Sequence, residues 1–216
     1  MRVLVTAGPT YEPIDPVRFI GNHSTGKMGY ALAEAFAAAG AEVILVSGPT
    51  NLPDPTHPLI QIQRVETADQ MYAAAVAIAP AADVWVFAAA VADYKPAHVA
   101  ANKIKKEGDT LTLELIKNVD IAATLGKTKR PEQFSVGFAL ETNNEEANAR
   151  EKLHRKNFDL VVLNSLRDAG AGFRVDTNKV TLLNAQGEIL IFEVKLKAAV
   201  AHDIVQAVLA RLPREA

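Results

Sequence analysis

The sequence contains no cysteine, and this absence removes several kinds of chemistry at once. Disulfide bridges, thiolate metal sites and a cysteine nucleophile are all excluded. A long apolar run is missing at the start, because Met1-Arg2 leads directly into the short stretch Val3-Leu4-Val5. Neither a signal peptide nor a membrane span is therefore expected. We expect a cytoplasmic protein without a membrane partner.

The sequence also lacks an excess of charge of one sign, since the net charge is only -2. No global attraction to nucleic acid follows from this balance, so any anionic ligand must be held by a local cluster of Lys and Arg. Histidine does not supply a metal site either. The five histidines show no ligand spacing: His23, His57, His98, His154 and His202. A catalytic zinc site is not expected, and no metal ligands are assigned.

The pattern along the chain predicts an α/β fold with a Rossmann-like wound parallel sheet. With 216 residues, 49% of them hydrophobic, residues 1–216 fit one domain. Apolar runs predict parallel strands, and amphipathic stretches predict helices between them. The strands are expected at residues 2–6, 42–47, 84–89, 134–139 and 159–163, and the helices at 30–39, 69–79, 121–125, 145–156 and 197–212.

Other local signals refine this fold. Capping boxes are expected at residues 67–70 and 142–145. An alternating stretch at 111–117 and a hairpin of 179–183 with 189–193 predict antiparallel additions to the sheet. The proline-rich residues 49–58 are interpreted as a surface loop.

Residues 21–29 nearly match the sequence pattern of a phosphate-binding loop. The P-loop pattern ends in a Ser or Thr that holds Mg²⁺, but Met28 occupies this position here. A thioether is a poor ligand for a hard cation, so an ordinary NTPase is disfavoured. Small residues and Lys27 before an apolar helix still suit an anion, because a helix N-terminus presents free N–H groups. A glycine turn that merely caps a core helix is the alternative.

Further charged residues follow other strands, where ligands of wound sheets bind. Asp93 follows the third predicted strand, and Lys103, Lys105 and Lys106 come shortly after it. A carboxylate can meet a ribose or a hydrated metal ion, and clustered lysines can hold a polyphosphate. A solvated lysine run is an equally good interpretation of the three lysines. Lys152 and Lys156, alone, are more typical of a soluble helix surface.

Two other function classes are alternatives for such a sheet. A nicotinamide oxidoreductase would use the same sheet, but G-x-G-x-x-G is absent after the first strand and no tyrosine is followed by lysine four residues later. A non-catalytic nucleotide-binding module stays open.

The motifs taken together resemble the phosphopantothenate-cysteine ligase family, over almost the whole chain and in the family's order. The matching segments are Thr6-Ala7-Gly8-Pro9-Thr10, Glu12-Pro13-Ile14-Asp15-Pro16-Val17-Arg18, residues 22–29, Ala88-Ala89-Ala90-Val91-Ala92-Asp93-Tyr94, Lys103-Ile104-Lys105-Lys106, Gly137-Phe138-Ala139, Glu141-Thr142 and Asp176-Thr177-Asn178. Departures from the family's pattern are Thr25, Val119 and Leu140.

The resemblance implies a carboxylate-amine ligase of coenzyme A biosynthesis. Such enzymes join 4'-phosphopantothenate to cysteine through an acyl-cytidylate, converting CTP with Mg²⁺ into CMP and pyrophosphate. By motif, Asn22 would face the acyl-phosphate carbonyl, and Lys103 would be the essential lysine near the nucleotide. The CTP site would be lined by Ala89, Asp93, Lys103, Asn118, Val119, Asp120, Ile121, Phe138, Lys152 and Lys156.

Partners and motion complete these expectations. The resemblance implies a homodimer and a flavin-dependent decarboxylase, fused or separate. CTP and ATP are not distinguished by the residues themselves. Because residues 94–108 are long, charged and contain Pro96, we expect a mobile lid that carries Lys103 to the nucleotide.

Overall fold

The computed structural model describes residues 1–106, 108–141, 143–165 and 175–212. Its elements, in chain order, are β1 (Arg2–Ala7), β2 (Tyr11–Pro13), β3 (Phe19–Gly21), α1 (Lys27–Ala38), β4 (Glu42–Ser47), β5 (Ile60–Arg64), α2 (Ala68–Ile78), η1 (Ala79–Ala81), β6 (Val84–Phe87), β7 (Tyr94–Pro96), β8 (Leu115–Lys117), α3 (Ile121–Gly126), β9 (Phe134–Glu141), α4 (Glu145–Arg155), β10 (Leu160–Ser165), β11 (Thr177–Asn178), β12 (Thr181–Asn184), β13 (Ile189–Ile191), β14 (Lys195–Leu196) and α5 (Lys197–Leu209).

The main sheet has eight strands in the order β13-β12-β10-β9-β6-β1-β4-β5. The six strands from β10 to β5 are parallel, and β12 and β13 add an antiparallel hairpin at one edge. This confirms the Rossmann-like sheet and the predicted hairpin. The sheet also contains a parallel strand that the sequence did not reveal, β5, whose polar Ile-Gln-Ile-Gln-Arg pattern suits an exposed edge.

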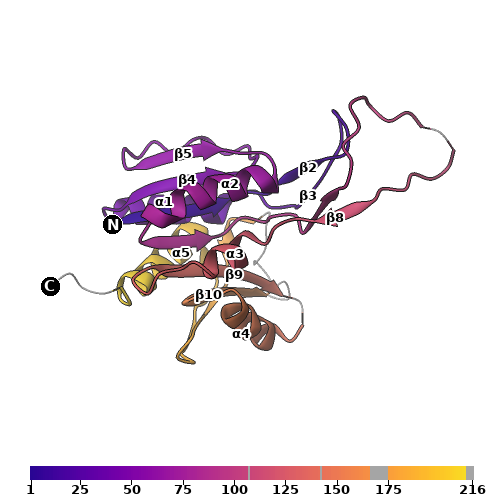
Figure 1. The fold of residues 1–216 in the computed structure, drawn as a ribbon. Helices are drawn as coiled ribbons and strands as arrows, with labels where there is room; N and C mark the ends of the chain where they lie inside the picture. Colours follow the sequence, from indigo (N-terminus) through magenta and orange to yellow (C-terminus); the bar gives the residue numbers. More distant parts are fainter. Residues whose placement is uncertain (107, 142, 166–174, 213–216) are drawn as a thin grey trace.

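Helices cover both faces of the sheet (Figure 1). The alternation along β1 shows how the faces divide. Val3 and Val5 belong to the core under α1 and α5, whereas Leu4 joins the core under α2 and α3. A further cluster packs α4 against β9 and β10. Because strands buried on both faces need apolar residues on both, their continuous apolar runs were readable from the sequence.

Helix boundaries agree with the local signals to within a few residues. At α2, Thr67 Oγ1 accepts from Gln70 N and the Gln70 side chain accepts from Thr67 N, which confirms the capping box. At α4 the N-cap is Asn144, with a left-handed φ of 45°. Thr142, the first residue of the other predicted capping box, lies outside the described residues.

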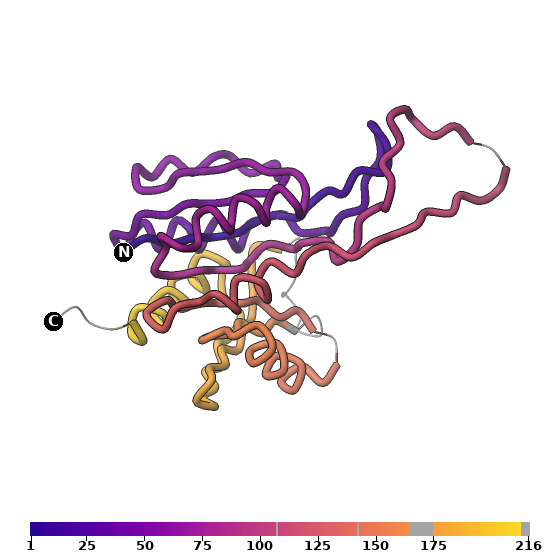
Figure 2. Tube along the Cα trace, in the orientation of Figure 1, coloured from indigo at the N-terminus to yellow at the C-terminus, as the bar shows by residue number. Residues whose placement is uncertain are grey.

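The prediction that residues 111–117 add an antiparallel strand to the main sheet is wrong. Only Leu115–Lys117 of the alternating stretch 111–117 forms a strand, and this β8 pairs with β7 instead of the main sheet. The two strands begin a projection, residues 94–117, that we call the arm. Figures 1 and 2 show the arm extending away from the sheet, at the end opposite the N-terminus. The alternation was real, but its apolar side chains do not pack on the core: Leu111, Leu115 and Ile116 are exposed.

Candidate active site

The carboxyl ends of β1 and β6 are extended by two segments that run side by side. Pro9 forms a parallel bridge with Ala90, and Ala92 N donates to Thr10 Oγ1 at 3.0 Å. Asn118 continues this layer, because its Nδ2 donates to Ala92 O at 2.8 Å. Its backbone N donates to the carbonyl of Asp93 at 2.9 Å. Residues distant in sequence are thereby fixed into one surface at the ligand-binding edge of the sheet.

A cavity of about 240 Å³ opens on this surface, and we call it the Asp120 pocket. It is lined by segments that follow β6 and β8, by β9 and by α4. Nine of the ten residues expected to line a nucleotide site border it: Ala89, Asp93, Asn118, Val119, Asp120, Ile121, Phe138, Lys152 and Lys156. Their contact with a nucleotide stays a prediction, but the geometry brings them together.

Asp120 has two roles in this pocket. Its Oδ1 accepts from Ala123 N at 3.0 Å and so caps α3. The same carboxylate lies 2.9 Å from Lys156 Nζ. Burial works against the charged form, but the hydrogen bonds from Lys156 and Ala123 outweigh it and lower the pKa of Asp120. An ion pair of a carboxylate and an ammonium therefore forms part of one wall of the cavity.

Lys152, one helical turn before Lys156, points to the boundary of the pocket. Its Nζ lies 3.4 Å from Phe138 O and 3.7 Å from a Glu141 carboxylate oxygen. Burial lowers the pKa of Lys152, and this is opposed by the charge of Glu141. The carboxylate that pairs with Lys152 is 3.7 Å away, whereas the one that pairs with Lys156 is 2.9 Å away. Lys152 is therefore better suited to bind an incoming anion.

A second cavity of about 230 Å³ adjoins the first, and we call it the Lys197 cavity. The two cavities share Ala89, Ala90, Phe138 and Lys152. Beyond that junction, residues 24–29 and the first residue of α5 line the second cavity. The sequence indicates Lys197 only as the start of a helix, and nothing in it shows that this residue borders a cavity together with residues 24–29.

The loop before α1, residues 22–26, caps the helix and also borders the second cavity. Gly26 caps the helix with φ 79°, and Lys27 is the first helical residue. Gly29 lies directly on β1, since a Cβ at this position would be 2.4 Å from Ala7 Cβ. Met28 packs against the core beneath α1. The glycine turn is therefore structural, and it also brings the first turn of α1 to the wall of the Lys197 cavity.

Asn22 lies beside the junction of the cavities. Its Nδ2 donates to Ala90 O at 3.0 Å, and Ala90 borders both cavities. The side chain is exposed, so its carboxamide is held near the strand end without being buried.

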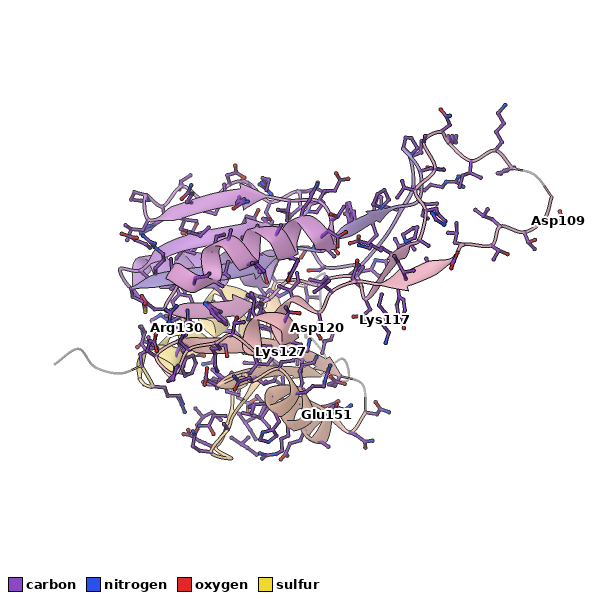
Figure 3. The ribbon with its side chains drawn as sticks, viewed as in Figure 1. Asp109, Lys117, Asp120, Lys127, Arg130 and Glu151 are labelled. Carbon is purple, nitrogen blue, oxygen red and sulfur yellow. The ribbon has the colours of Figure 1, made fainter. Side chains whose placement is uncertain are left out.

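Lys103 is a predicted site residue that borders neither cavity. It lies on the arm with an exposed side chain. The neighbouring Ile104 is fixed, because its N donates to Asp15 Oδ2 at 3.1 Å and its O accepts from Arg18 Nη2 at 3.2 Å. Figure 3 shows how far the arm reaches: Asp109 lies on its outer part, and Asp120 lies on the body. Glu107, inside the expected lid, lies outside the described residues.

The Asp15 carboxylate explains why this part of the arm is anchored. Its side chain has 0% exposure and accepts from Val17 N and Arg18 N, each at 2.9 Å. The ion pair with Arg18, with help from these N–H groups and that of Ile104, holds the pKa of Asp15 well below its usual range. Up to Ile104, the predicted lid is therefore attached to the β2–β3 hairpin.

Two features are absent from the described residues. No helix in them is both long and apolar enough to cross a membrane. Within the same residues, no group of three or more His, Asp or Glu side chains is arranged to hold a metal ion.

The wound sheet, with two adjoining cavities at its carboxyl edge, defines a Rossmann-like α/β protein, a class whose ligands bind at that edge. Residues 1–212 match the family model described as "DNA/pantothenate metabolism flavoprotein C-terminal domain". The chain belongs to this family, which confirms the resemblance to phosphopantothenate-cysteine ligases.

Individual relatives cover nearly the whole chain. It is 47% identical over 208 residues to the "Coenzyme A biosynthesis bifunctional protein CoaBC" of Bacillus subtilis, covering 96% of this chain and 51% of the relative. It is 49% identical over 208 residues to a prokaryotic "Cysteine/Cysteine sulfinic acid decarboxylase", covering 96% of this chain and 58% of that protein. The chain thus spans little more than half the length of these curated relatives.

A solved structure supports the fold. The chain superposes on the crystal structure of the C-terminal domain of a coenzyme A biosynthesis bifunctional protein CoaBC with a TM-score of 0.81 and 42% identity. The match covers 96% of this chain and 93% of that domain.

Proposed function

We propose that this chain is a carboxylate-amine ligase that joins 4'-phosphopantothenate to cysteine, using CTP and forming an acyl-cytidylate. One observation carries the proposal above the others. Nine residues from separate parts of the chain line the Asp120 pocket, and this pocket meets a second cavity at Ala89, Ala90 and Lys152. Such an arrangement suits two substrates whose reacting ends must meet.

The Asp120 pocket is assigned to the nucleoside part of CTP. It combines an apolar wall, Phe138 and Ile121, with polar groups that can fix orientation, as nucleotide sites usually do. Asp93 offers a carboxylate at the mouth of the pocket. Mg²⁺ usually enters a site on phosphates and takes only one or two carboxylates from the protein. Asp93 thus suits a magnesium ion delivered with CTP, and it would bind that ion as part of the substrate.

The first chemical step is assigned to the junction of the cavities. A carboxylate oxygen of phosphopantothenate attacks the α-phosphorus, the bond to the β-phosphate oxygen breaks, and pyrophosphate leaves. Two anions approach each other in this step, so catalysis depends on positioning and on neutralisation of charge. Lys152 is assigned this role because it borders both cavities. Lys103 would add a second charge only after the arm moves.

The second step transfers the acyl group to cysteine. The amine nitrogen attacks the acyl carbon, the bond to the CMP oxygen breaks, and the nitrogen loses a proton to solvent. Negative charge develops on the carbonyl oxygen, and a neutral donor can stabilise it. The Asn22 carboxamide is assigned this role, because its hydrogen bond to Ala90 O already places it beside the junction.

The test is pyrophosphate release with each nucleoside triphosphate, with and without phosphopantothenate. We expect release only with the acid present, preference for CTP, and CMP formation that depends on cysteine. Folded protein that forms no CMP over a range of substrate and magnesium concentrations would contradict the proposal.

Two further assays test for other activities. Because one relative is named a cysteine decarboxylase, carbon dioxide release from cysteine without nucleotide is measured in parallel. NADPH oxidation is measured for the oxidoreductase alternative. We expect neither signal, and binding of CTP without any turnover would favour the non-catalytic module.

The assembly is also a proposal. Relatives twice as long are named bifunctional, so a flavin-dependent decarboxylase, fused or separate, is the expected functional partner. We propose a homodimer whose contacts include the exposed apolar side chains of the arm and the β2–β3 hairpin, among them Val17, Phe19, Val99 and Leu115. Sedimentation of the chain and of a Val99→Asp variant tests this contact.

A further inference from the structure

Glu141, the last residue of β9, is a half-buried carboxylate that the proposed mechanism does not use. Its side chain is 20% exposed, and it borders neither the Asp120 pocket nor the Lys197 cavity. Both of its oxygens face α4: Oε2 accepts from Asn148 Nδ2 at 3.0 Å, and Oε1 lies 3.7 Å from Lys152 Nζ. One carboxylate therefore connects the end of β9 to two successive turns of α4.

The contact with Asn148 accounts for only one of the two oxygens. Asn148 Nδ2 also donates to Asn143 O at 3.0 Å, so this amide holds the start of α4 against β9 and the segment between them. An uncharged acceptor, such as the oxygen of a glutamine, could make the same contact with Asn148. Local structure thus does not require the negative charge, and Lys152 is the residue that the charged Oε1 faces.

The ammonium of Lys152 is held at long distances. In the part of the chain that the structure describes, its Nζ has two partners, Phe138 O at 3.4 Å and Glu141 Oε1 at 3.7 Å, and both belong to β9. A lysine has three N–H donors, and contacts of this length use little of their capacity. The two groups of β9 therefore direct the ammonium to the junction of the cavities while its donors stay available for a ligand.

From these contacts we propose that Glu141 is a positioning residue, which holds the Lys152 ammonium at the junction of the two cavities as the cation that binds the triphosphate of CTP. Glu141 does not touch the nucleotide and acts through Lys152. The inference rests on the proposed function, because the ligand is a substrate of that reaction. Binding is measured without turnover, however. A chain that binds CTP as expected below but forms no CMP would contradict the proposed function and leave this inference intact.

The charge of Glu141 also affects the pH range in which Lys152 is a cation. Burial is the largest effect on Lys152, and it lowers the pKa of this side chain. The charges of Lys156 and Arg155 lower it further, but those of Glu141 and Asp120 raise it. Affinity for a phosphate is present while Lys152 is protonated and falls as pH rises through its pKa. Without the Glu141 charge, this fall should therefore begin at a lower pH.

The experiment is calorimetric titration of the full chain with CTP and Mg²⁺, and separately with inorganic triphosphate, between about pH 7 and pH 10. In Glu141→Gln the fall in affinity should begin about one pH unit lower than in the wild type, because two charges 3.7 Å apart interact by about this much even in a solvent-like medium. The variant should bind about tenfold more weakly at the alkaline end and nearly as the wild type does near pH 7. Glutamine still accepts from Asn148, so the fold should be kept.

A second substitution assigns the shift to Lys152. In a Lys152→Met background, Glu141→Gln should no longer change the pH dependence of binding. The other charged groups that line the two cavities are the same in all of these proteins: Asp93, Asp120, Lys156, Lys27 and Lys197. A shift that persists without Lys152 would overturn the proposal, because it would come from another titrating group.

Glu146→Gln is the matched control. Glu146 is in the first turn of α4, pairs with Arg150 at 2.9 Å and borders neither cavity. This variant should bind both ligands as the wild type does at every pH.

Two results for Glu141→Gln would overturn the positioning role. One is a pH profile identical to that of the wild type, and the other is an equal loss of affinity at every pH, which a purely structural role would produce. If Glu141→Gln does not fold, Glu141→Asp decides. Its charge is one methylene further from Lys152, so a smaller shift in the same direction is expected, and an unchanged profile overturns the proposal. Wild-type protein that binds neither ligand would contradict this inference and the proposed function together.

Discussion

The Asp120 pocket and the arm gather their residues in different ways. In the pocket, parallel strands and their crossovers bring the ends of β6 and β9 to the same edge, so a site forms from distant segments. On the arm, Lys103, Lys105 and Lys106 are neighbours in sequence and remain exposed. A charge cluster along the chain is thus no guide to a charge cluster in the site.

The two regions also differ in what holds them. Pocket residues are fixed by the core, because Ile121 and Phe138 extend packed clusters. The arm is held by a few polar contacts: Asp15 binds Arg18 and Ile104, Ala100 N donates to Ile14 O, and Lys95 pairs with Asp69. Such contacts are easier to release than a packed core. The proposed role of Lys103 requires this release, so that the site is completed only when substrates bind.

The largest expected effect is on the kcat of a variant of the arm. Lys103→Gln should lower kcat by about 10³-fold or more, because a lysine that neutralises phosphate charge in a closed site contributes far more than one in solvent. Steady-state pyrophosphate release measures this effect, and circular dichroism should show an unchanged fold.

Lys106→Gln is the control for that variant, since it removes an exposed lysine from the same part of the arm. It should retain most of the activity. Near-wild-type turnover in Lys103→Gln, or an equal loss in both variants, would show that Lys103 has no special role.

The next effect concerns the junction. Asn22→Asp should slow the second half-reaction about 10²–10³-fold, because an anion replaces the donor that faces developing negative charge. The first half-reaction should be affected less, so acyl-cytidylate should accumulate. Quenched-flow chromatography follows the intermediate, and its normal breakdown in the variant would argue against this role of Asn22.

The sequence predicted the parts of the fold that local physics determines. Buried strands such as β1 and β6 are continuous apolar runs, and α2 begins at a capping box that the structure reproduces. Edge elements were harder. β5 has only Ile60 and Ile62 on its apolar face, and β8 has the alternation of a sheet strand but pairs with β7 instead of the main sheet. Pairing partners are tertiary facts, and alternation does not reveal them.

The same limit applies to the site. The family's motifs indicated nine residues that the structure gathers around the Asp120 pocket, although taken alone Lys152 and Lys156 would have been interpreted as a solvated surface. Lys197 could not be found in this way. Its position depends on the packing of α5 against α1, and no short spacing records that contact.

A smaller effect tests the anchor of the arm. Asp15→Ala should release Ile104 and Arg18, because it removes the carboxylate that accepts from both. Trypsin should then cut at Lys103, Lys105 and Lys106 several-fold faster than in the wild type. Limited proteolysis with mass spectrometry gives the rates, with and without CTP.

Asp109→Asn, which changes a carboxylate on the outer part of the arm, should leave those rates unchanged. Equal cleavage of Asp15→Ala and wild type would mean that the arm is held by other contacts. Wild-type cleavage that CTP does not alter would contradict the expected movement of the lid.

The smallest effect concerns stability at the pocket wall. Asp120→Asn keeps an N-cap side chain for α3 but removes the charge that pairs with Lys156. The folded pKa of Asp120 is below the value of 3.8 for an unperturbed aspartate. Its charge therefore stabilises the fold fully above about pH 4, and this contribution disappears as pH falls through the lower folded pKa. Because the side chain is 39% exposed, the difference at neutral pH should be at most about 1 kcal/mol. Urea unfolding at several pH values measures it: the free energies of unfolding of wild type and variant should converge at low pH. A difference that stays constant down to about pH 2 would show that the ion pair is not its cause.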